Sequence, residues 1–440
     1  MKPYPKYKDS GIEWLGEVPE EWSILRSDSV INYVRNQIDP ETIESDTVFH
    51  YSIPIVQESG TGQSEPTDEL GSAKQLITLK SVLVSKLNPH KATICIAEPQ
   101  DEVTICSSEF IAIAMQAKKC DITFLFYLSN SEMNRQRLDA RVQSVTRSHQ
   151  RVYPSDIYKF WLALPPKFEQ KAIATFLDRE TARIDALIQK KERMIELLKE
   201  KRIALITRAV TKGLDPNVPM KDSGIEWLGE VPKHWEVNRI KYIASRIQTG
   251  CTPPTSNEKY YEDGTIQWFG PSSFTDDLYL TDPVKMINDI SITDGVARLF
   301  EKGSIMIVGI GATIGKIAQN TMPSSCNQQI TVITLKRSKC YPDYYTYLLK
   351  TMENTIRGIA PSATLAIFDQ GEIGCLLVLL PPLHEQMQVA DFLSGQLREL
   401  TYMISAICSS IDLLREYRSS IINHAVTGKI DLRDYDAQAQ

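Results

Sequence analysis

Two long segments of the chain carry apolar residues at the spacing of a helix that packs on a partner helix. In the later segment these residues alternate four and three positions apart, which is the heptad pattern of a coiled coil. The earlier segment has the same pattern 216 residues before, interrupted by the polar residues Thr181 and Lys191. We expect the apolar residues to form the packing seam: Leu177, Ile184, Ile188, Ile195, Leu198, Leu393, Leu397, Leu400, Ile404, Ile407, Ile411 and Leu414.

Each of these helices should run for about 40 residues, or ~60 Å. A single amphipathic helix of that length cannot bury its apolar stripe alone in a soluble protein. We therefore predict that residues 177–205 and 393–421 pack on each other as an antiparallel pair. Arg202 falls on the seam, as Arg418 does in the other copy. Lys191 and Arg202 either fix the helix register, face a partner protein, or extend along the edge of the seam towards solvent.

Between the helices, apolar residues follow the shorter spacing that is typical of strands. Short helices are also indicated, at 121–138 and 342–357. These patterns predict two mixed α/β domains. The expected strands include 92–97, 110–115, 304–308, 330–335 and the apolar runs FWLALPP (160–166) and LLVLLPP (376–382).

The chain is one unit used twice. The string DSGIEWLGEVP occupies 9–19 and recurs at 222–232, and PPKFEQ (165–170) is matched by PPLHEQ (381–386). Each unit is a small packed turn, a variable region and a long helix. We expect the first turn to pack against the end of the second helix, which would close the chain into a pseudo-symmetric circle. The expected anchors of the two joints are Trp14, Trp22, Trp227 and Trp235.

The predicted fold class is α+β, with two mixed α/β globular domains separated by two long antiparallel coiled-coil helices in an internal pseudo-two-fold, circular repeat. The predicted boundaries are 1–22 for the first turn, 23–164 for the first domain, 165–212 for the first long helix, 213–235 for a linker with the second turn, 236–380 for the second domain, 381–429 for the second long helix and 430–440 for a tail.

The composition is that of an ordinary soluble protein. The 440 residues are 42% hydrophobic and 24% charged, with a net charge of −6. We find neither a signal sequence nor an apolar run of about 18 residues, so the cytoplasm is the expected compartment. The eight cysteines form no C-x-x-C pair, which argues against disulfides and structural zinc and favours buried small side chains.

A search for catalytic motifs finds none that is complete. In IVGIGATIGK (307–316), a dinucleotide loop would need glycine at Ile314, and a phosphate loop would need glycine at Ile310. A strand–turn–strand is the better interpretation. Glu169, Gln170 and Lys171 have the E-x-K spacing of many nucleases but lack the upstream Pro-Asp. We expect no catalytic residue, metal site or cofactor in this chain.

The remaining polar segments favour binding of nucleic acid. RQRLDARVQSVTRSHQR (135–151) has five arginines against one acid, although a solvated helix face is the alternative interpretation. Arginines suit phosphates and guanine, and amides such as those at 327–329 read adenine. The net negative charge suggests that a partner protein completes the surface. The candidate DNA-binding residues are Arg135, Arg137, Arg141, Thr146, Arg147, His149, Arg151, Thr249, Thr252, Lys316, Asn327, Gln328, Gln329, Ser362 and Thr364.

With these motifs in place, the chain resembles the specificity subunit of a type I restriction-modification system. The duplicated P-x-x-W motif runs from Pro19 to Trp22 and from Pro232 to Trp235. LPP-x-x-EQ, at 164–170 and 380–386, begins both long helices, and GATIGK is followed by NQQI. These features span nearly the whole chain in the order of that family.

The resemblance implies two target-recognition domains, each reading one half of a split, asymmetric DNA site. It also implies two methyltransferase subunits docked on the helices, two translocase-nuclease subunits, and methylation at adenine N6. S-adenosylmethionine, ATP and Mg²⁺ would be bound by those partners and not by this chain. Two alternatives stay open: a coiled-coil scaffold without a role on nucleic acid, and a self-contained DNA-modifying enzyme.

One departure from an idealised family member concerns charge. Residues 165–212 have twelve Lys and Arg against seven acids, whereas 381–429 have four against five. Strict equivalence of the two partner-docking faces is therefore in doubt.

Overall fold

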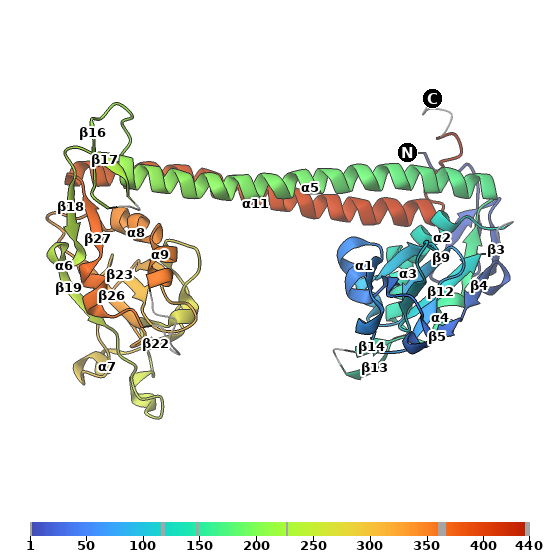
Figure 1. Ribbon diagram of the computed structural model, residues 1–440, viewed down its shortest axis with the longest axis horizontal. Helices are drawn as coiled ribbons and strands as arrows, with labels where there is room; N and C mark the ends of the chain where they lie inside the picture. Colours follow the sequence, from blue (N-terminus) through green and yellow to red (C-terminus); the bar gives the residue numbers. More distant parts are fainter. Residues whose placement is uncertain (1, 116–118, 147–148, 226–227, 360–366, 436–440) are drawn as a thin grey trace. The chain divides into compact units, whose positions relative to one another are not determined.

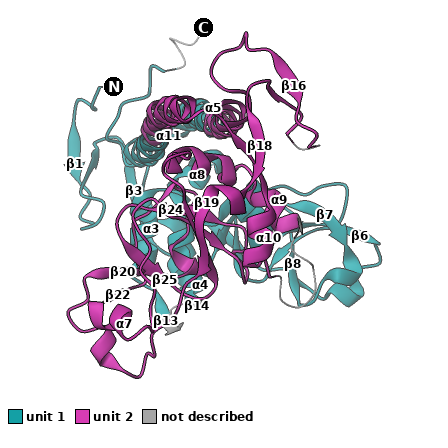
Figure 2. Ribbon diagram, turned by 90° about the vertical axis from the view of Figure 1, so that its left-hand side faces the viewer, with its two compact units in different colours: residues 1–192, 408–440 teal, residues 193–407 magenta. Residues whose placement is uncertain are grey.

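The structure is a computed structural model that describes residues 2–115, 119–146, 149–225, 228–359 and 367–435. The chain divides into two compact units, one made of residues 1–192 and 408–440 (unit 1) and one of residues 193–407 (unit 2) (Figure 2). Each unit contains one mixed domain and one part of each long helix. The division therefore cuts through the helices, whereas the predicted boundaries treat the helices as separate segments.

The two long helices are α5 (Lys167–Lys212) and α11 (Leu383–Val426). In unit 1 the beginning of α5 shares a core with the end of α11, and in unit 2 the end of α5 shares a core with the beginning of α11 (Figure 1). The pairing is antiparallel, as predicted. Every predicted seam residue is buried or half-buried, with Leu177, Ile184 and Leu393 at 0% exposure.

Polar residues on the same seam are accommodated in different ways. Thr181 is buried and donates a hydrogen bond from Oγ1 to the carbonyl oxygen of Leu177 at 2.7 Å, which satisfies the hydroxyl inside the helix. Arg418 forms a two-pronged ion pair with Asp185, with N···O distances of 2.8 and 3.1 Å. Lys191 is half-buried.

The domain of unit 1 is built from two small sheets. One has the strand order β10-β9-β12-β4 and the other β5-β8-β11-β6-β7, with β11 parallel to β6 and the other pairs antiparallel. Helix α2 packs on β9 and β10. The strands are β4 (Ile31–Val34), β5 (Gln37–Ile38), β6 (Thr47–Tyr51), β7 (Gln63–Pro66), β8 (Lys74–Leu76), β9 (Ser81–Ser85), β10 (Ile94–Ala97), β11 (Thr104–Ser107) and β12 (Phe110–Met115). The helices are α1 (Ile53–Ser59), α2 (Ile122–Ser129), α3 (Glu132–Asp139) and α4 (Pro154–Tyr158).

The domain of unit 2 also has two sheets. Their orders are β19-β26-β23-β24-β21 and β22-β20-β25, and helix α8 packs on β24. The predicted strand–turn–strand over 307–316 is present, because β23 and β24 pair antiparallel on either side of that turn. The strands are β19 (Ala244–Thr249), β20 (Ile266–Phe269), β21 (Tyr279–Leu280), β22 (Lys285–Ile287), β23 (Ile305–Val308), β24 (Ile317–Asn320), β25 (Ser324–Cys326) and β26 (Ile330–Leu335). The helices are α6 (Ile240–Ile243), α7 (Asp289–Thr293), α8 (Pro342–Lys350), α9 (Glu353–Ile359) and α10 (Gln370–Cys375).

Both domains are joined to their long helix in the same way. A short two-stranded sheet precedes each helix: β15 (Trp161–Leu164) pairs with β3 (Ser23–Arg26), and β27 (Leu377–Leu380) pairs with β18 (Glu236–Arg239). The repeated turns form hairpins, β1 (Tyr7–Asp9) with β2 (Glu17–Pro19) and β16 (Met220–Asp222) with β17 (Glu230–Pro232).

The duplicated tryptophan and glutamate motifs meet in unit 1. Trp22 is fully buried, and its indole Nε1 donates a hydrogen bond to Glu169 Oε1 at 2.9 Å. The hydroxyl of Tyr4 donates to the same oxygen. The neighbouring Gln170 accepts from the backbone of Asp121 at 2.6 Å and donates to the carbonyl of Pro165 at 2.8 Å, which fastens the start of α5 to the domain.

Unit 2 repeats this joint. Trp235 is fully buried, and its Nε1 donates to Glu385 Oε2 at 2.9 Å, with His234 taking the place of Tyr4 as the second partner at 2.7 Å. Gln386 accepts from the backbone of Tyr341 at 2.8 Å and donates to the carbonyl of Pro381 at 2.7 Å. The E-Q pair that resembled part of a nuclease motif is thus a structural joint.

The end of α11 meets the first turn, as the circular repeat predicts. The Tyr7 hydroxyl donates to the carbonyl of Gly428 at 3.2 Å, and Lys429 Nζ donates to the carbonyl of Glu17 at 2.8 Å. Gly428 has φ +70° and lies so close to Pro19 that an added Cβ would come within 2.4 Å of it. Of the other predicted anchors, Trp14 is half-buried and Trp227 lies outside the described residues.

The expectation of buried cysteines holds for five of the eight, Cys95, Cys106, Cys120, Cys326 and Cys340. It is wrong for Cys375 and Cys408, which are exposed, while Cys251 is half-buried. Cys408 lies on the solvent side of α11 between seam positions, where the heptad pattern places no constraint on the residue.

Removal of one seam leucine should destabilise the protein far more than removal of an exposed leucine from the same helix. Leu393 is at 0% exposure and Leu413 at 65%. We expect Leu393→Ala to lower the free energy of unfolding by about 2–5 kcal/mol and Leu413→Ala by about 0.5 kcal/mol or less. Urea denaturation followed by circular dichroism measures both values, and equal losses would contradict the packing of the seam.

The joint in unit 1 should make stability depend on pH. Burial raises the pKa of Glu169, and the hydrogen bonds from Tyr4 and Trp22 only partly offset this. Because the pKa is higher in the folded than in the unfolded state, the protonated carboxyl adds stability below about pH 4.3, and this is lost as pH rises through the folded pKa. The difference in unfolding free energy between the wild type and Glu169→Gln should therefore fall over that window. Glu13→Gln, at an exposed carboxylate of the first turn, is the control, and a difference that stays constant with pH would refute the assignment.

Candidate nucleic-acid interface

The arginine-rich segment of unit 1 folds as a helix followed by a two-stranded hairpin. Helix α3 begins with Ser131 as its cap and is followed by β13 (Gln143–Thr146) and β14 (His149–Arg151), which pair antiparallel with an irregular register between Ser144 and Thr146. Within the described residues of this segment, helix is thus confined to the end of α3. A two-stranded ribbon of this kind has the dimensions to enter the major groove of DNA.

Arg137 is directed into the domain and not towards solvent. Its side chain is buried, its Nε and Nη2 donate to Asn134 Oδ1 at 3.0 and 2.7 Å, and its Nη1 donates to the carbonyl of Asp156 at 2.8 Å. The guanidinium also lies 4.2 Å from the centre of the Phe160 ring. Burial lowers the pKa of Arg137 to about 10. These contacts are those of a residue that fastens α3 to the domain.

The other described arginines of the segment are more accessible. Arg135 is 33% exposed and pairs with Glu132 at 3.3 Å. Arg141 is 47% exposed and donates to the carbonyl of Arg137 at 3.0 Å. Arg151 is 57% exposed and pairs with Glu109 at 2.9 Å. Such exposed pairs are weak, so a phosphate could replace the carboxylate at little cost.

The structure adds two polar side chains to this surface that the sequence pattern does not indicate. The hairpin is held by Asn88, whose backbone donates to the carbonyl of Gln150 at 2.7 Å and whose Oδ1 accepts from the Gln150 backbone at 3.2 Å. Directly after it, the 3-10 turn Pro89–Lys91 packs against α3 and carries the exposed side chains of His90 and Lys91. They are distant in sequence from the arginines, so only the fold brings them together.

Three candidates of the first domain have no described side chain. Thr146 and His149 are placed by their backbones, at the two strand ends that face the tip of the hairpin. Arg147 lies outside the described residues.

In unit 2, several candidates gather at the loop between β25 and β26. Asn327 is buried and shapes this loop, because its Nδ2 donates to Gln329 Oε1 at 2.9 Å and its Oδ1 accepts from the Gln329 backbone at 3.0 Å. Gln328 is exposed and accepts a hydrogen bond from the hydroxyl of Thr252, which comes from the segment after β19. An added Cβ on Gly250 would lie 2.1 Å from the carbonyl oxygen of Cys326, so glycine permits this close approach.

Two further polar side chains reach the same place. Arg298 donates to the carbonyl oxygen of Thr249, and the amide of Gln370 lies 3.1 Å from the Thr249 hydroxyl. Neither was indicated by the sequence, since each comes from a separate part of the chain. The loop residues Thr249, Thr252, Gln328 and Gln329, together with Arg298 and Gln370, form the polar loop surface of unit 2.

Lys316 is not part of this polar loop surface. Its Nζ pairs with Asp276 at 3.0 Å, close to Lys350, and it is 24% exposed. Ser362 and Thr364 lie outside the described residues.

The described residues provide little for catalysis. Among them, no group of three or more His, Cys, Asp or Glu is arranged to hold a metal ion, and no helix is long and apolar enough to cross a membrane. Burial raises the pKa of the thiols of Cys95, Cys106 and Cys120 to about 12, so these thiols stay protonated at neutral pH and are poor nucleophiles. The accessible polar groups are donors and acceptors suited to binding.

The comparison with known families gives one match that covers most of the chain. The family described as the type I restriction modification DNA specificity domain matches residues 19–197 and 232–405, which are the two copies of the repeat. The chain belongs to this DNA specificity family. Its role is therefore to recognise DNA sequence without catalysis, and the comparisons lend no support to the scaffold or to the self-contained enzyme.

Individual relatives of this specificity-family chain agree over their full length. The putative type I restriction enzyme MjaX specificity subunit of Methanocaldococcus jannaschii is 21% identical, over 95% of this chain and 96% of the relative. The MjaVIII specificity subunit of the same organism is 21% identical over 97% and 98%.

Solved structures show that the fold is shared. A chain from a study of complex assembly and conformational transition of a type I restriction-modification system has a TM-score of 0.70 and 18% identity, over 94% of this chain and 99% of that one. The HsdS subunit from Thermoanaerobacter tengcongensis has a TM-score of 0.57 and 17% identity, over 94% and 98%.

The different settings of Arg137 and Arg151 in this specificity-family chain predict different mutant phenotypes. Arg137→Ala removes a buried guanidinium from its partners, so it should lower the free energy of unfolding by about 3 kcal/mol. Arg151→Ala should change the free energy of unfolding by about 0.5 kcal/mol or less. It should also reduce the slope of log DNA affinity against log salt concentration by the amount expected for about one phosphate contact. Thermal unfolding and filter binding at several salt concentrations measure these effects, and an unchanged salt dependence would remove Arg151 from the interface.

Proposed function

We propose that the two domains read the two halves of a split, asymmetric DNA site and that the long helices position two methyltransferase and two restriction subunits for adenine methylation or cleavage. Under this proposal, S-adenosylmethionine, ATP and Mg²⁺ belong to those partners. The protein would act in the cytoplasm.

The proposal rests on the observation that equivalent joints attach two domains whose candidate binding surfaces differ. Trp22 with Glu169, and Trp235 with Glu385, fix the two domains to their helices by the same indole-to-carboxylate bond at 2.9 Å. Yet the first domain offers arginines around a hairpin, and the second offers amides and hydroxyls on loops. Two surfaces with different donors and acceptors suit two different base sequences.

The charge distribution supports a requirement for partners. The chain carries 49 Lys and Arg against 55 Asp and Glu, and the accessible arginines of the first domain are partly neutralised by Glu132 and Glu109. Binding of DNA depends strongly on how many phosphates are neutralised. A partner that adds basic surface would therefore raise the affinity for both half-sites.

Variants of each domain test whether each domain reads one half of the site. In cells that express the chain with its methyltransferase, sequencing of methylated adenines should yield one bipartite motif. Gln328→Ala should relax the motif in one half only, where discrimination between bases at the affected base pair should fall by about tenfold or more. Arg135→Ala combined with Arg151→Ala should weaken methylation without relaxing the half read by the second domain.

Arg183→Ala, which removes an exposed arginine from α5, is the matched control and should leave both halves intact. Relaxation of both halves by Gln328→Ala would contradict the assignment of one half-site to each domain. Methyl transfer by the purified chain without a partner would contradict the non-catalytic role.

A further inference from the structure

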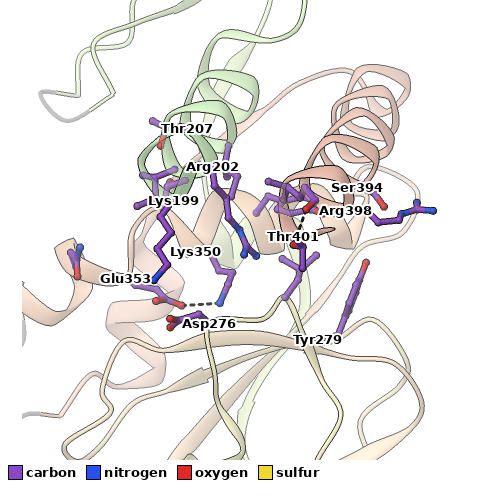
Figure 3. A pocket seen from close by; sticks show the side chains of 17 residues that line it. Lys199, Arg202, Thr207, Asp276, Tyr279, Lys350, Glu353, Ser394, Arg398 and Thr401 are labelled. Atoms are coloured by element: carbon purple, nitrogen blue, oxygen red, sulfur yellow. Dashed lines mark hydrogen bonds and ion pairs between the residues drawn. The ribbon is translucent and has the colours of Figure 1, made fainter. Parts of the chain in front are cut away.

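Unit 2 contains a cavity of about 650 Å³ where the second part of α5 and the first part of α11 face the domain. Helices α8 and α9 and the loop before β21 complete its wall. Figure 3 shows Arg202 reaching from α5 into the space between the helices and Lys199 descending towards Lys350 and Glu353, while Arg398 points away. A cavity of this volume falls in the range of roughly 300–1,000 Å³ that is typical of small-molecule sites.

Comparison of the two copies of the repeat shows which acidic residues this cavity lacks. At the register of 216 residues, Asp178, Asp185 and Glu192 of α5 form a row at seven-residue spacing, and their equivalents on α11 are Ser394, Thr401 and Cys408. The three acids of one copy are therefore neutral in the other. Ser394 and Thr401 both line the cavity.

In unit 1 each acid of the row has a donor. Asp178 accepts from the Tyr127 hydroxyl at 2.8 Å, and Asp185 accepts from Arg418 at 2.8 and 3.1 Å. Glu192 pairs with Arg415 at 3.2 Å.

In unit 2 the equivalent donors remain while the acids are gone. Arg202 is equivalent to Arg418, and Lys199 is equivalent to Arg415. Tyr347 is equivalent to Tyr127, because each lies six residues after the residue whose backbone the helix glutamine binds. That residue is Tyr341 for Gln386 and Asp121 for Gln170. Within the part of the chain that the structure describes, the Arg202 guanidinium, the Lys199 ammonium and the Tyr347 hydroxyl make no hydrogen bond and no ion pair. All three residues line the cavity.

The remaining charges of the cavity leave it positive. Lys350 is held by the carbonyl of Ile317 at 3.0 Å and by Glu353 at 3.3 Å, and Lys316 pairs with Asp276 at 3.0 Å. Asp276 also interacts electrostatically with Arg202. The four lining cations Lys199, Arg202, Lys350 and Arg398 nevertheless outnumber the two lining acids Asp276 and Glu353, so a net positive charge remains. A dianion would balance it, and a phosphate monoester has a charge of about −2 near neutral pH.

Part of the wall is apolar, beside the polar side chains of Thr207, Thr351, Asn354, Ser394 and Thr401. Leu278, Ile206 and Leu397 line the cavity beside the ring of Tyr279. An inorganic anion would leave this surface in contact with water, whereas an organic group attached to the anion would cover it.

We propose that this cavity binds a small organic phosphate, whose phosphate group takes the place that the carboxylate of Asp185 occupies in unit 1 and accepts hydrogen bonds from Arg202, while Lys199 and Tyr347 line the same cavity. Arg202 binds the phosphate through its planar fork, as Arg418 binds the carboxylate. This site is distinct from the candidate DNA-reading loops and needs neither DNA nor a partner for its occupation.

Calorimetric titration of the purified full-length chain with phenyl phosphate, inorganic phosphate and phenylacetate tests the assignment. Phenyl phosphate should bind about tenfold or more tightly than either of the other two, because only it combines a dianion with an apolar group. Absence of binding by phenyl phosphate, or equal binding of inorganic phosphate, would overturn the proposal.

Two variants locate the binding. Arg202→Gln should weaken the affinity for phenyl phosphate by about tenfold or more, because it removes the charged fork. Thr401→Asp places an acid where Asp185 stands in the other copy, so Arg202 should pair internally and binding should be lost. Arg183→Gln, on the exposed side of α5, is the matched control and should bind like the wild type.

Thermal unfolding monitored by circular dichroism separates loss of the site from loss of the fold. Thr401→Asp is expected to unfold at the wild-type temperature or above it, since it restores an ion pair that unit 1 possesses. Undiminished binding of phenyl phosphate by a folded Thr401→Asp or Arg202→Gln protein would refute the site.

Discussion

A buried carboxylate is costly unless donors are directed at it, and unit 1 of this protein is assembled around one such carboxylate, with the half-buried Glu385 at the equivalent place in unit 2. In unit 1 the donors are the indole of Trp22 and the hydroxyl of Tyr4, and the acceptor is Glu169 on the first turn of α5. The three residues come from the N-terminal segment, the first turn motif and the long helix. The hydrogen bonds to this one carboxylate therefore fix the positions of the N-terminal segment, of the domain and of the first turn of α5.

The same constraint explains why the repeated strings are so similar while the domains between them differ. A tryptophan that must reach a glutamate, and a glutamine that must cap the strand-to-helix turn, tolerate little change. Gln170 and Gln386 make equivalent bonds on both sides, to the backbones of Asp121 and Tyr341. The loops that carry Arg151 or Gln328 meet no such condition, so their side chains can differ between the two domains.

Much of the fold was predictable because it depends on periodic or repeated positions. The heptad spacing predicted the seam, the register of 216 predicted that the units are equivalent, and the failed nucleotide motifs correctly left a strand–turn–strand at 307–316. The candidate surface was less predictable, because the charge of a residue does not show the direction of its side chain. Arg137 lies in the same run of arginines as Arg151, yet it is buried against Phe160. Arg298 and Gln370 join Thr249 only through the fold.

The unequal charge of the two long helices arises from their bases, twelve against four, and not from their acids, seven against five. The helix with twelve bases and seven acids holds the row Asp178, Asp185 and Glu192, whose partners in unit 1 are Tyr127, Arg418 and Arg415. Because α11 lacks that row, Arg202 and Lys199 of α5 have no acids in unit 2 equivalent to the partners of Arg418 and Arg415 in unit 1. An arginine without a counter-ion on a packed seam lowers stability unless another anion compensates it. The two copies thus differ in that unit 1 has structural ion pairs where unit 2 has a site that an external anion can fill, while both units keep the indole-to-carboxylate joint.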